Sequence, residues 1–483
     1  MSPFLQHSYT QIGTQRGVKR LWLQGLKLEE CGFERGERYR VDYDVDRNEI
    51  RLVLCDSGNR VVSGRKRGNR VDPIVDICNA DVVRFAGNAA RVRADFRPGI
   101  IVFSISHLDR KRDEREARFL AEAHQGSLTK ASVCAGIGMA SAALHEGLAQ
   151  AGIESEVVWI ADRSRRYLQV ACDNNVAVTN KTKLFEATLE ELEPELLDPV
   201  SILQASLPCT GHSPAGKAKN QIADAESHAT DATAVFGLMK IVEAVQPAVI
   251  VSEQVIPGRN SATYTLIKSM LTVLDYFIHE IDLGPEQSGA MESRRRYWFV
   301  AVSKGLDALD LNTIPVFDRQ YEKLGDLLEP ISAEDPRWSE NEYLKKKQVR
   351  DKAAGKGFAQ RQLLTENAGQ IGTAGRGYQK KRSCEPFLTR ADGKERLLTP
   401  LELCRAHGAP ESLIANTVDG VAYESLGQGI DWNQAVGIGR VIARDLCQSV
   451  GERSTTEATS RVDTEVAAVV VEDEVGLQLQ MFA

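Results

Sequence analysis

A cysteine just past a short apolar run is the first candidate for chemistry. Residues 200–203 form that run, which predicts a buried strand, and Pro208 and Gly211 then interrupt regular structure. Cys209 therefore lies on a loop at a strand end, where open α/β sheets bind ligands. A thiol there can act as a nucleophile, and the Ser-Pro-Ala-Gly sequence at 213–216 suits a loop that closes over a substrate. The alternative is a small core residue, since free cysteines are often buried.

A carboxylate and a group of arginines accompany two further predicted strands. The apolar residues 248–251 predict a strand that carries Glu253 to the same sheet edge as Cys209. The segment Glu292-Ser293-Arg294-Arg295-Arg296 opens another apolar strand and directs its arginines toward strand-end chemistry. The alternatives are a carboxylate that caps a turn and ordinary surface arginines.

A glycine-containing turn predicts a nucleotide-type cofactor site. Cys134-Ala135-Gly136-Ile137-Gly138 follows a predicted strand and precedes an amphipathic helix, and Asp162 ends the next strand. Glycines let a ligand approach the backbone, and an acid at the second strand end can bind ribose hydroxyls. The third glycine of a dinucleotide site is absent, which favours a mononucleoside cofactor over NAD. Phe185 and Glu186, at a further strand end, are available to an adenine ring.

Composition limits the class of protein. The chain has 483 residues, of which 42% are hydrophobic and 26% charged, as in globular proteins, and no apolar run is long enough for a membrane helix. Nine cysteines without CxxC pairs argue against a disulfide framework and against a metal site, and favour a cytoplasmic protein. The net charge of −7 means that nucleic-acid binding would need a local basic patch.

The chain divides into six expected parts. Residues 1–110 form a β-rich domain, 111–129 a linker helix, 130–304 an α/β domain, 305–395 a basic region, 396–450 closing helices, and 451–483 a poorly ordered tail. In the first part, the Leu-x-Gly-x-x-Leu pattern and the alternating strands resemble the swapped-hairpin barrels of AbrB-like and SymE-like proteins. Those families often bind nucleic acid. A solvated loop is the favoured interpretation of the nearby basic cluster, Arg60, Arg65, Lys66, Arg67 and Arg70.

The region 305–395 carries many lysines and arginines, with flexible glycines between them. Such a stretch suits phosphate contacts, although a solvated face is the alternative. The candidate substrate-binding residues here are Arg376, Tyr378 and Lys380. Thr399, Pro400 and Glu402 then predict the capped start of a helix.

Taken together and in this order, the motifs resemble the DNA cytosine-5 methyltransferases over residues 130–450. The matching segments are Cys134–Gly138, Asp162, Leu207-Pro208-Cys209 with Ser213, Ser252–Val255, Glu292–Arg296, the helix start at 396–408 and Gly427–Ile430. The resemblance implies a Rossmann-like α/β sheet, S-adenosyl-L-methionine as methyl donor, double-stranded DNA as partner, and a target-recognition region at 305–395. It adds Gln428 and Ile430 to the expected cofactor site.

The resemblance also implies the chemistry. A Cys209 thiolate would add to C6 of a flipped-out cytosine, and Glu253 would protonate N3. Arg294 would hold the base oxygen and help to position Cys209, and Arg296 would contact phosphate or shape the loop. We expect a monomer, with dimerisation through the N-terminal domain as the alternative.

The sequence departs from the family at five positions, and two other functions compete with the main one. Cys134 stands where the family usually has Phe, Thr210 and Glu292 where it has Gln, and Gln254 and Gln428 where it has Asn. A tRNA cytosine methyltransferase of the same fold would keep Cys209 and Glu253. It usually lacks an added N-terminal barrel. A non-catalytic DNA-binding regulator would not need either residue.

Overall fold

The computed structural model describes residues 6–208, 229–306, 309–355 and 362–448. Cys209, Thr210, Ser213 and the tail at 451–483 therefore lie outside the described residues. The chain forms two compact units, Met1–Glu114 and Arg115–Ala483, and each is described by itself. No helix among the described residues is long and apolar enough to cross a membrane.

The first unit is built mainly from strands. One sheet has the order β1-β9-β10-β5-β4-β6, and a second has the order β2-β3-β8-β7. Its elements are β1 (His7–Gln11), β2 (Gly13–Gln15), β3 (Val18–Gln24), α1 (Leu26–Glu29), β4 (Arg38–Asp44), β5 (Glu49–Leu54), β6 (Arg60–Val61), β7 (Ser63–Arg67), β8 (Arg70–Ile77), α2 (Ala80–Ala86), β9 (Arg91–Arg97) and β10 (Ile100–Ile105).

This unit contains an internal repeat, because β3-α1-β4-β5 and β8-α2-β9-β10 have the same order of elements. The two copies pair with each other symmetrically. Leu21 lies opposite Ile77, and Leu23 lies opposite Val75. All four side chains are buried in one core. The β5–β10 pair repeats the symmetry, so the unit contains its own two-fold partner within one chain. The resemblance to swapped-hairpin barrels stays a prediction.

The second unit is organised around a seven-stranded sheet with the order β13-β12-β11-β14-β15-β17-β16. The first five strands are parallel, and β17 runs antiparallel to both of its neighbours. The strands are β11 (Ser127–Val133), β12 (Glu154–Asp162), β13 (Lys183–Glu186), β14 (Ile202–Ala205), β15 (Val249–Gln254), β16 (Tyr276–Leu283) and β17 (Arg296–Ser303). The central strands are buried on both faces, which explains their continuous apolar sequences.

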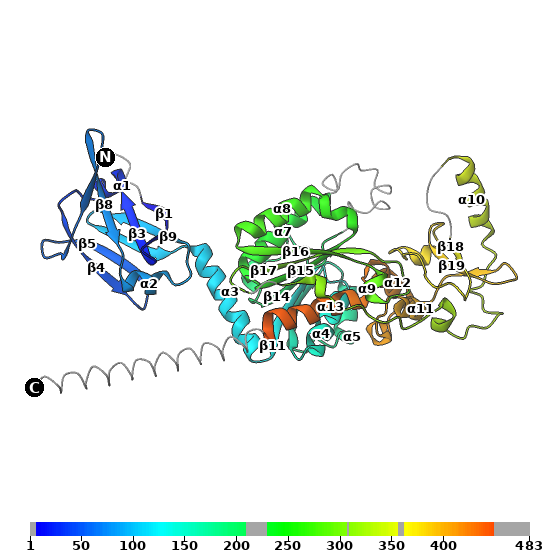
Figure 1. Cartoon of the computed structure of the whole chain (residues 1–483). Coiled ribbons are helices and arrows are strands. Elements are labelled where there is room, and N and C mark those ends of the chain that lie inside the picture. Colours follow the sequence, from blue (N-terminus) through cyan, green and yellow to red (C-terminus); the bar gives the residue numbers. More distant parts are fainter. Residues whose placement is uncertain (1–5, 209–228, 307–308, 356–361, 449–483) are drawn as a thin grey trace, which may run out of the picture. The chain divides into compact units, whose positions relative to one another are not determined.

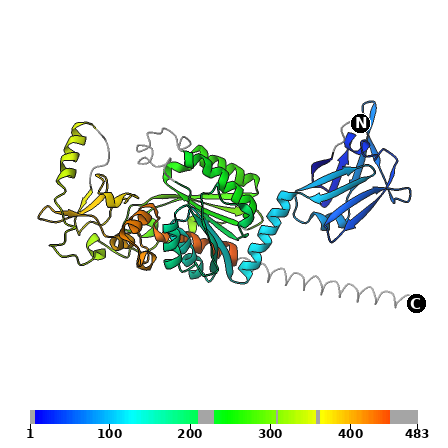
Figure 2. The same ribbon diagram turned by 180° about the vertical axis from the view of Figure 1, so that it is seen from behind.

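Helices cover both faces of this sheet (Figures 1 and 2). On one face lie α7 (Ala229–Val245) and α8 (Ala262–Val273), and on the other lie α4 (Met139–Gln150), α5 (Arg165–Asn174) and α13 (Trp432–Ile442). Each face has its own hydrophobic core. Close packing of α4 on α13 depends on Gly147, where a Cβ would lie 2.1 Å from the Val436 carbonyl oxygen. A π-helical turn, Ala443–Gln448, follows α13 directly.

The helix α3 (His107–His124) crosses the division between the two units. Its residues from Arg115 onward belong to the second unit and bind the amino-terminal side of the sheet. Arg115 donates to Ser303 Oγ at 2.9 Å and to Leu274 O at 2.8 Å. Arg118 donates to Val200 O at 3.0 Å. The second half of α3 is therefore an integral part of the catalytic unit.

Residues 285–288, 309–355 and 362–448 complete the second unit. A small sheet, β18-β19-β20, packs beside the long basic helix α10. The elements are α9 (Pro285–Ser288), α10 (Glu342–Ala353), β18 (Gln362–Leu364), β19 (Pro386–Thr389), β20 (Glu395–Arg396), α11 (Pro400–Ala406) and α12 (Asp419–Gln428), with short 3-10 turns between them. α11 begins with the capping box that its sequence predicts, in which Thr399 and Glu402 bond each other's backbone N–H groups.

Candidate active site

Three strand ends converge at the carboxyl edge of the sheet. β14 and β15 are parallel, and Ala205 lies opposite Ser252, so Glu253 lies beside the segment that leads to Cys209. β17 is antiparallel to β15, with Glu253 opposite Trp298. Because of that direction the start of β17, and not its end, reaches this edge. Arg296 is the first residue of the strand.

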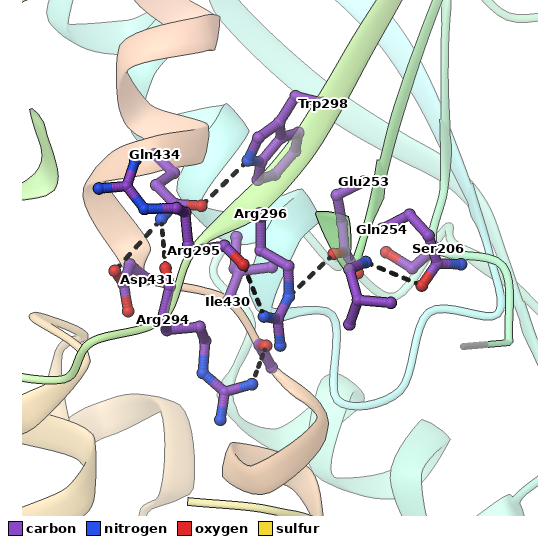
Figure 3. Close-up of polar contacts among 12 residues, drawn as sticks. Ser206, Glu253, Gln254, Arg294, Arg295, Arg296, Trp298, Ile430, Asp431 and Gln434 are labelled. Carbon is purple, nitrogen blue, oxygen red and sulfur yellow. Dashed lines mark hydrogen bonds and ion pairs between the residues drawn. The ribbon is translucent and has the colours of Figure 1, made fainter. Parts of the chain in front are cut away.

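Glu253 and Arg296 form a partly buried ion pair. Arg296 Nε lies 3.4 Å from a Glu253 carboxylate oxygen, and the two side chains are 12% and 11% exposed. Figure 3 shows them pointing toward one another from β17 and β15. Burial raises the pKa of Glu253, and the charges of Arg296 and Arg294 offset only part of that effect. The carboxyl group is therefore one that tends to hold a proton, as a general acid must.

Arg294 does not fit the role that the sequence assigns to it. Its side chain is 1% exposed, and its donors are engaged by the Glu292 carboxylate and by the carbonyl oxygens of Ala374 and Gly429. Contact with a base oxygen would require these bonds to break. Arg296 is the arginine that faces Glu253, so the geometry supports exchanging the two arginine roles.

Gln254 supports the segment before Cys209. Its Nε2 lies 3.5 Å from the Leu207 carbonyl oxygen and 3.4 Å from the Tyr264 hydroxyl. Gly258 makes room for this longer side chain, since a Cβ there would lie 2.3 Å from the Gln254 Cγ. The glutamine at a position where the family has asparagine is thus accommodated by a neighbouring glycine.

The predicted cofactor turn has the backbone geometry that glycine allows. Gly136 has φ of 56° and Gly138 of 74°. A Cβ on Gly138 would lie 2.5 Å from Asn175 Nδ2, so only glycine fits. Cys134 also has positive φ, and burial raises the pKa of its thiol to about 12, which keeps it an inert thiol at neutral pH.

Asp162 lies directly beside this turn. Its two oxygens accept hydrogen bonds from Gly136 N at 2.8 Å and from Ser164 N at 2.9 Å. Asp162 lies opposite Glu186 in the parallel pair β12–β13, and Phe185 is its neighbour in that strand. The turn, the acid and the two adenine candidates therefore occupy three adjacent strand ends, which is an arrangement that fits a nucleoside with a ribose and a flat base.

Gln428 and Ile430 lie near the same turn but differ in environment, because Gln428 makes polar contacts and Ile430 is buried in the core. Gln428 Nε2 donates to the Tyr167 hydroxyl at 3.2 Å and to Glu424 O at 2.9 Å. The Ile430 side chain is only 2% exposed and belongs to the core, as does that of Ile137. Contact between these two isoleucines and a cofactor stays a prediction.

Two of the three candidate DNA-binding residues are accessible. Arg376 and Lys380 are exposed. Tyr378 is not, because its ring is fully buried and its hydroxyl donates to Pro386 O at 2.8 Å and accepts from Leu398 N at 2.9 Å. The prediction that Tyr378 contacts substrate is therefore wrong for this structure. The exposed residues of α10 are better candidates, namely Tyr343, Lys346, Arg350 and Lys352.

Sequence reasoning missed a buried histidine behind the site. His407 is fully buried, and its Nε2 lies 2.9 Å from a Glu292 carboxylate oxygen. Nothing in its sequence context sets it apart, since it simply ends α11 before Gly408. Its importance follows from its neighbours, because its ring lies against Glu292 on one side and against the Ile430 carbonyl oxygen on the other.

Comparison with known proteins identifies the family. A model described as C-5 cytosine-specific DNA methylase matches residues 128–444, more than half of the chain, which therefore belongs to that family. The Type II methyltransferase M.SsoII of Shigella sonnei is 27% identical over 238 residues, 47% of this chain and 60% of that protein. The Type II methyltransferase M1.ScrFI of Lactococcus lactis subsp. cremoris is 25% identical over 238 residues, 47% of this chain and 58% of that protein.

A solved structure supports the fold. The S. pombe Dnmt2 methyltransferase matches with a TM-score of 0.51 at 17% identity, covering 65% of this chain and 98% of that one. The expected Rossmann-like methyltransferase sheet and the resemblance over residues 130–450 are thus confirmed. The match with M.SsoII and M1.ScrFI covers about three fifths of their length.

Proposed function

We propose that the protein transfers a methyl group from S-adenosyl-L-methionine to C5 of a cytosine in double-stranded DNA. The observation that carries the proposal is the Glu253–Arg296 pair at the carboxyl edge, beside the strand that leads to Cys209, within the span that matches the family. Its relatives M.SsoII and M1.ScrFI are named Type II methyltransferases, which supports DNA methylation.

The residues have complementary roles in this reaction. The Cys209 thiolate adds to C6, and the proton that Glu253 holds passes to N3, which makes C5 nucleophilic. Arg296 is close enough to Glu253 to orient it and to hold the base oxygen. After methyl transfer, the C5 proton leaves to a base, the C5–C6 double bond re-forms, Cys209 departs as the thiolate and N3 returns its proton to Glu253.

S-adenosyl-L-methionine supplies the methyl group from a sulfonium when it is bound. The Gly136–Gly138 turn would let this ligand come close to the protein backbone, and Asp162 would accept hydrogen bonds from its ribose hydroxyls. Phe185 and Glu186 would contact its adenine, and Gln428 would belong to the same cofactor site. Asp162 remains suited to this role because each of its oxygens keeps a lone pair beyond the two backbone hydrogen bonds.

Double-stranded DNA binds the recognition region at 305–395, with α10, Arg376 and Lys380 in contact with phosphates. Ser213 contacts the flipped cytosine or its phosphate. We further propose a cytoplasmic monomer, because the internal two-fold of the N-terminal unit needs no second chain.

A covalent trap tests the proposal. Duplex DNA with 5-fluorocytosine at the target has no C5 proton to lose, so the protein should stay attached in a band that survives denaturation and requires S-adenosyl-L-methionine. Cys209→Ala should abolish the band. Attachment to a fluorinated tRNA but not to DNA would favour the tRNA methyltransferase, and DNA binding without attachment to either would favour a non-catalytic regulator.

A further inference from the structure

A buried cluster of charged side chains lies behind the Glu253–Arg296 pair and has no part in the chemistry above. At its centre Arg294 Nη1 donates to Gly429 O at 2.9 Å, and Nη2 donates to Ala374 O at 2.6 Å. One guanidinium thus connects the segment before β17, the recognition region and the turn before α13.

Glu292 supplies the negative charge that a buried arginine requires. Its Oε1 accepts from Arg294 Nη2 at 3.0 Å and from the backbone N–H of Ala374 at 2.8 Å. Burial alone would raise the pKa of Glu292, but the neighbouring Arg294 and His407 outweigh it and lower the pKa to about 2. The carboxylate is therefore ionised at neutral pH and binds two segments at once.

His407 extends the cluster to a fourth segment, the end of α11. Its Nε2 lies 2.9 Å from Glu292 Oε2, and its Nδ1 lies 3.1 Å from Ile430 O. A carbonyl oxygen only accepts, so Nδ1 carries a proton, and the other ring nitrogen faces a carboxylate. Asp431 lies 3.9 Å away, and burial together with the charge of Glu292 raises its pKa well above the usual range.

Each segment held by this cluster carries part of the proposed active site. Arg296 lies two residues after Arg294, and Gln428 lies directly before Gly429. The recognition region packs tightly against the same turn, because a Cβ on Gly427 would lie 2.4 Å from the Gly375 carbonyl oxygen. A displacement of Arg294 would therefore move the base-facing arginine, the cofactor-side turn and the recognition region together.

We propose that Glu292 and His407 are positioning residues for methyl transfer, which hold Arg294 as a bracket between the recognition region and the cofactor-side turn. This inference rests on the proposed function. Glutamine, which the related methyltransferases usually have at this position, could accept the same two N–H groups. In this chain it would leave Arg294 without a counterion and would place an amide against His407 Nε2 in place of the carboxylate, so Glu292 and His407 form a matched pair.

The test compares Glu292→Gln with the double variant Glu292→Gln/His407→Gln in the full chain. Steady-state kinetics give kcat and both KM values, calorimetry gives the Kd of S-adenosyl-L-methionine, and thermal melting establishes that each variant is folded. Glu292→Gln should lower kcat about 10²-fold, as expected for a small misplacement of reacting groups. It should also raise the Kd of S-adenosyl-L-methionine about tenfold, because hydrogen bonds that hold the cofactor-side turn are lost. Replacing His407 as well should restore about tenfold of the kcat, because the buried imidazole that was matched to the carboxylate is then absent.

A second buried ion pair gives a matched control. Arg396 and Glu402 form two hydrogen bonds of 2.6 and 2.8 Å, and both side chains are at most 2% exposed. This pair bonds neither Arg294 nor the turn at Gly429. Glu402→Gln should lower the melting temperature, yet in the folded state kcat and the S-adenosyl-L-methionine Kd should stay within about twofold of wild type.

Three results would overturn the proposal that Glu292 and His407 hold Arg294 in position. They are a folded Glu292→Gln variant with wild-type kcat and cofactor affinity, an equal loss in Glu402→Gln, and a double variant no better than Glu292→Gln. Wild-type protein that binds S-adenosyl-L-methionine but never methylates DNA would refute the proposed function alone, and calorimetry of the variants would then decide the inference. Wild-type protein that does not bind S-adenosyl-L-methionine would overturn both.

Discussion

Replacing Arg296 with glutamine should move the alkaline limb of the pH–rate profile upward. Glu253 must hold its proton to protonate N3, so the rate falls as the pH rises through its pKa. Arg296 favours the ionised carboxylate and lowers that pKa. Without this charge the pKa of Glu253 rises further, and the protonated form persists to higher pH.

The contact distance sets the size of the effect. Two unit charges separated by 3.4 Å attract with about 5 kcal/mol at an effective dielectric of about 20, which is an upper limit. Both side chains keep roughly a tenth of their surface exposed, so solvent screening reduces the net effect. Neighbouring opposite charges commonly shift a carboxyl pKa by about 1–3 units, so the loss of Arg296 should move the alkaline limb upward by an amount that a pH–rate profile resolves.

The alkaline limb can be measured by single-turnover methyl transfer to a DNA duplex in a rapid-quench experiment. A pH range of about 6 to 9 covers the range in which such groups titrate. The maximal rate also falls in Arg296→Gln, because a contact to the base is lost, but the position of the limb is independent of that amplitude. The acidic limb, which reflects ionisation of Cys209, should not move.

Arg295→Gln is the matched control. Arg295 is adjacent in sequence, but its side chain is 52% exposed and pairs with Glu286 at 2.6 Å. Its removal should leave both limbs in place. An alkaline limb that stays fixed or moves downward in Arg296→Gln would refute the assignment of Glu253 as the acid whose proton Arg296 controls.

Further predictions concern the cofactor, the fold and DNA. Asp162→Asn should weaken S-adenosyl-L-methionine binding by about 1–3 kcal/mol, measured by calorimetry, because one charged hydrogen-bond acceptor for the ribose is lost. Burial lowers the pKa of Lys130 to about 7, so the folded state binds fewer protons than the unfolded state, and wild-type stability rises with pH between about 7 and 10.5. Lys130→Met should therefore raise the melting temperature, with a gain that shrinks across that window. Deletion of residues 1–106, which keeps α3, should leave the methylated sequence unchanged in bisulfite sequencing. The double variant Lys346→Glu/Arg350→Glu should raise the KM for DNA. It should also reduce by about two the slope of the logarithm of DNA affinity against the logarithm of salt concentration.

Distinct outcomes would contradict these predictions. Wild-type affinity in Asp162→Asn would remove the acid from the ribose site. A gain in Lys130→Met that grows with pH would mean that the lysine is charged in the folded state. A new methylated sequence after the deletion would give the N-terminal unit a part in target selection, and an unchanged salt slope would move the DNA away from α10.

The strand ends of the site were predictable, and the arginine roles were not. Parallel strands share a carboxyl edge, so apolar runs that end in Glu253 or at Asp162 predict neighbours in space. Arg294 and Arg296 lie two residues apart at the start of one strand, and no local pattern separates them. Their difference comes from the carbonyl groups of Ala374 and Gly429, which lie 80 and 135 residues away.

Tyr378 and the N-terminal repeat are two further features that were not predicted from the sequence. An aromatic residue among basic residues suggests contact with nucleic acid, but Tyr378 is held in the core by partners on Pro386 and Leu398. The repeat preserves buried apolar positions, such as Leu28 and Val82, and the largely exposed Arg-x-Arg-x-Asp pattern of β4 and β9, and sequence reasoning missed it. In both cases tertiary partners, and not residue type, determine the environment.

The direction of β17 explains how one sheet edge gathers both the acid and its arginine. A parallel strand would bring only its end to that edge, whereas the antiparallel β17 brings its start, with Arg296 one residue beyond the Gln254–Tyr297 pair. A slip of one residue would turn Arg296 to the other face of the sheet. The register is held from outside the strand, since Gln434 accepts from Trp298 Nε1 at 3.0 Å and donates to Arg294 O at 2.9 Å. The closing helix α13 therefore fixes the position of the Glu253–Arg296 pair.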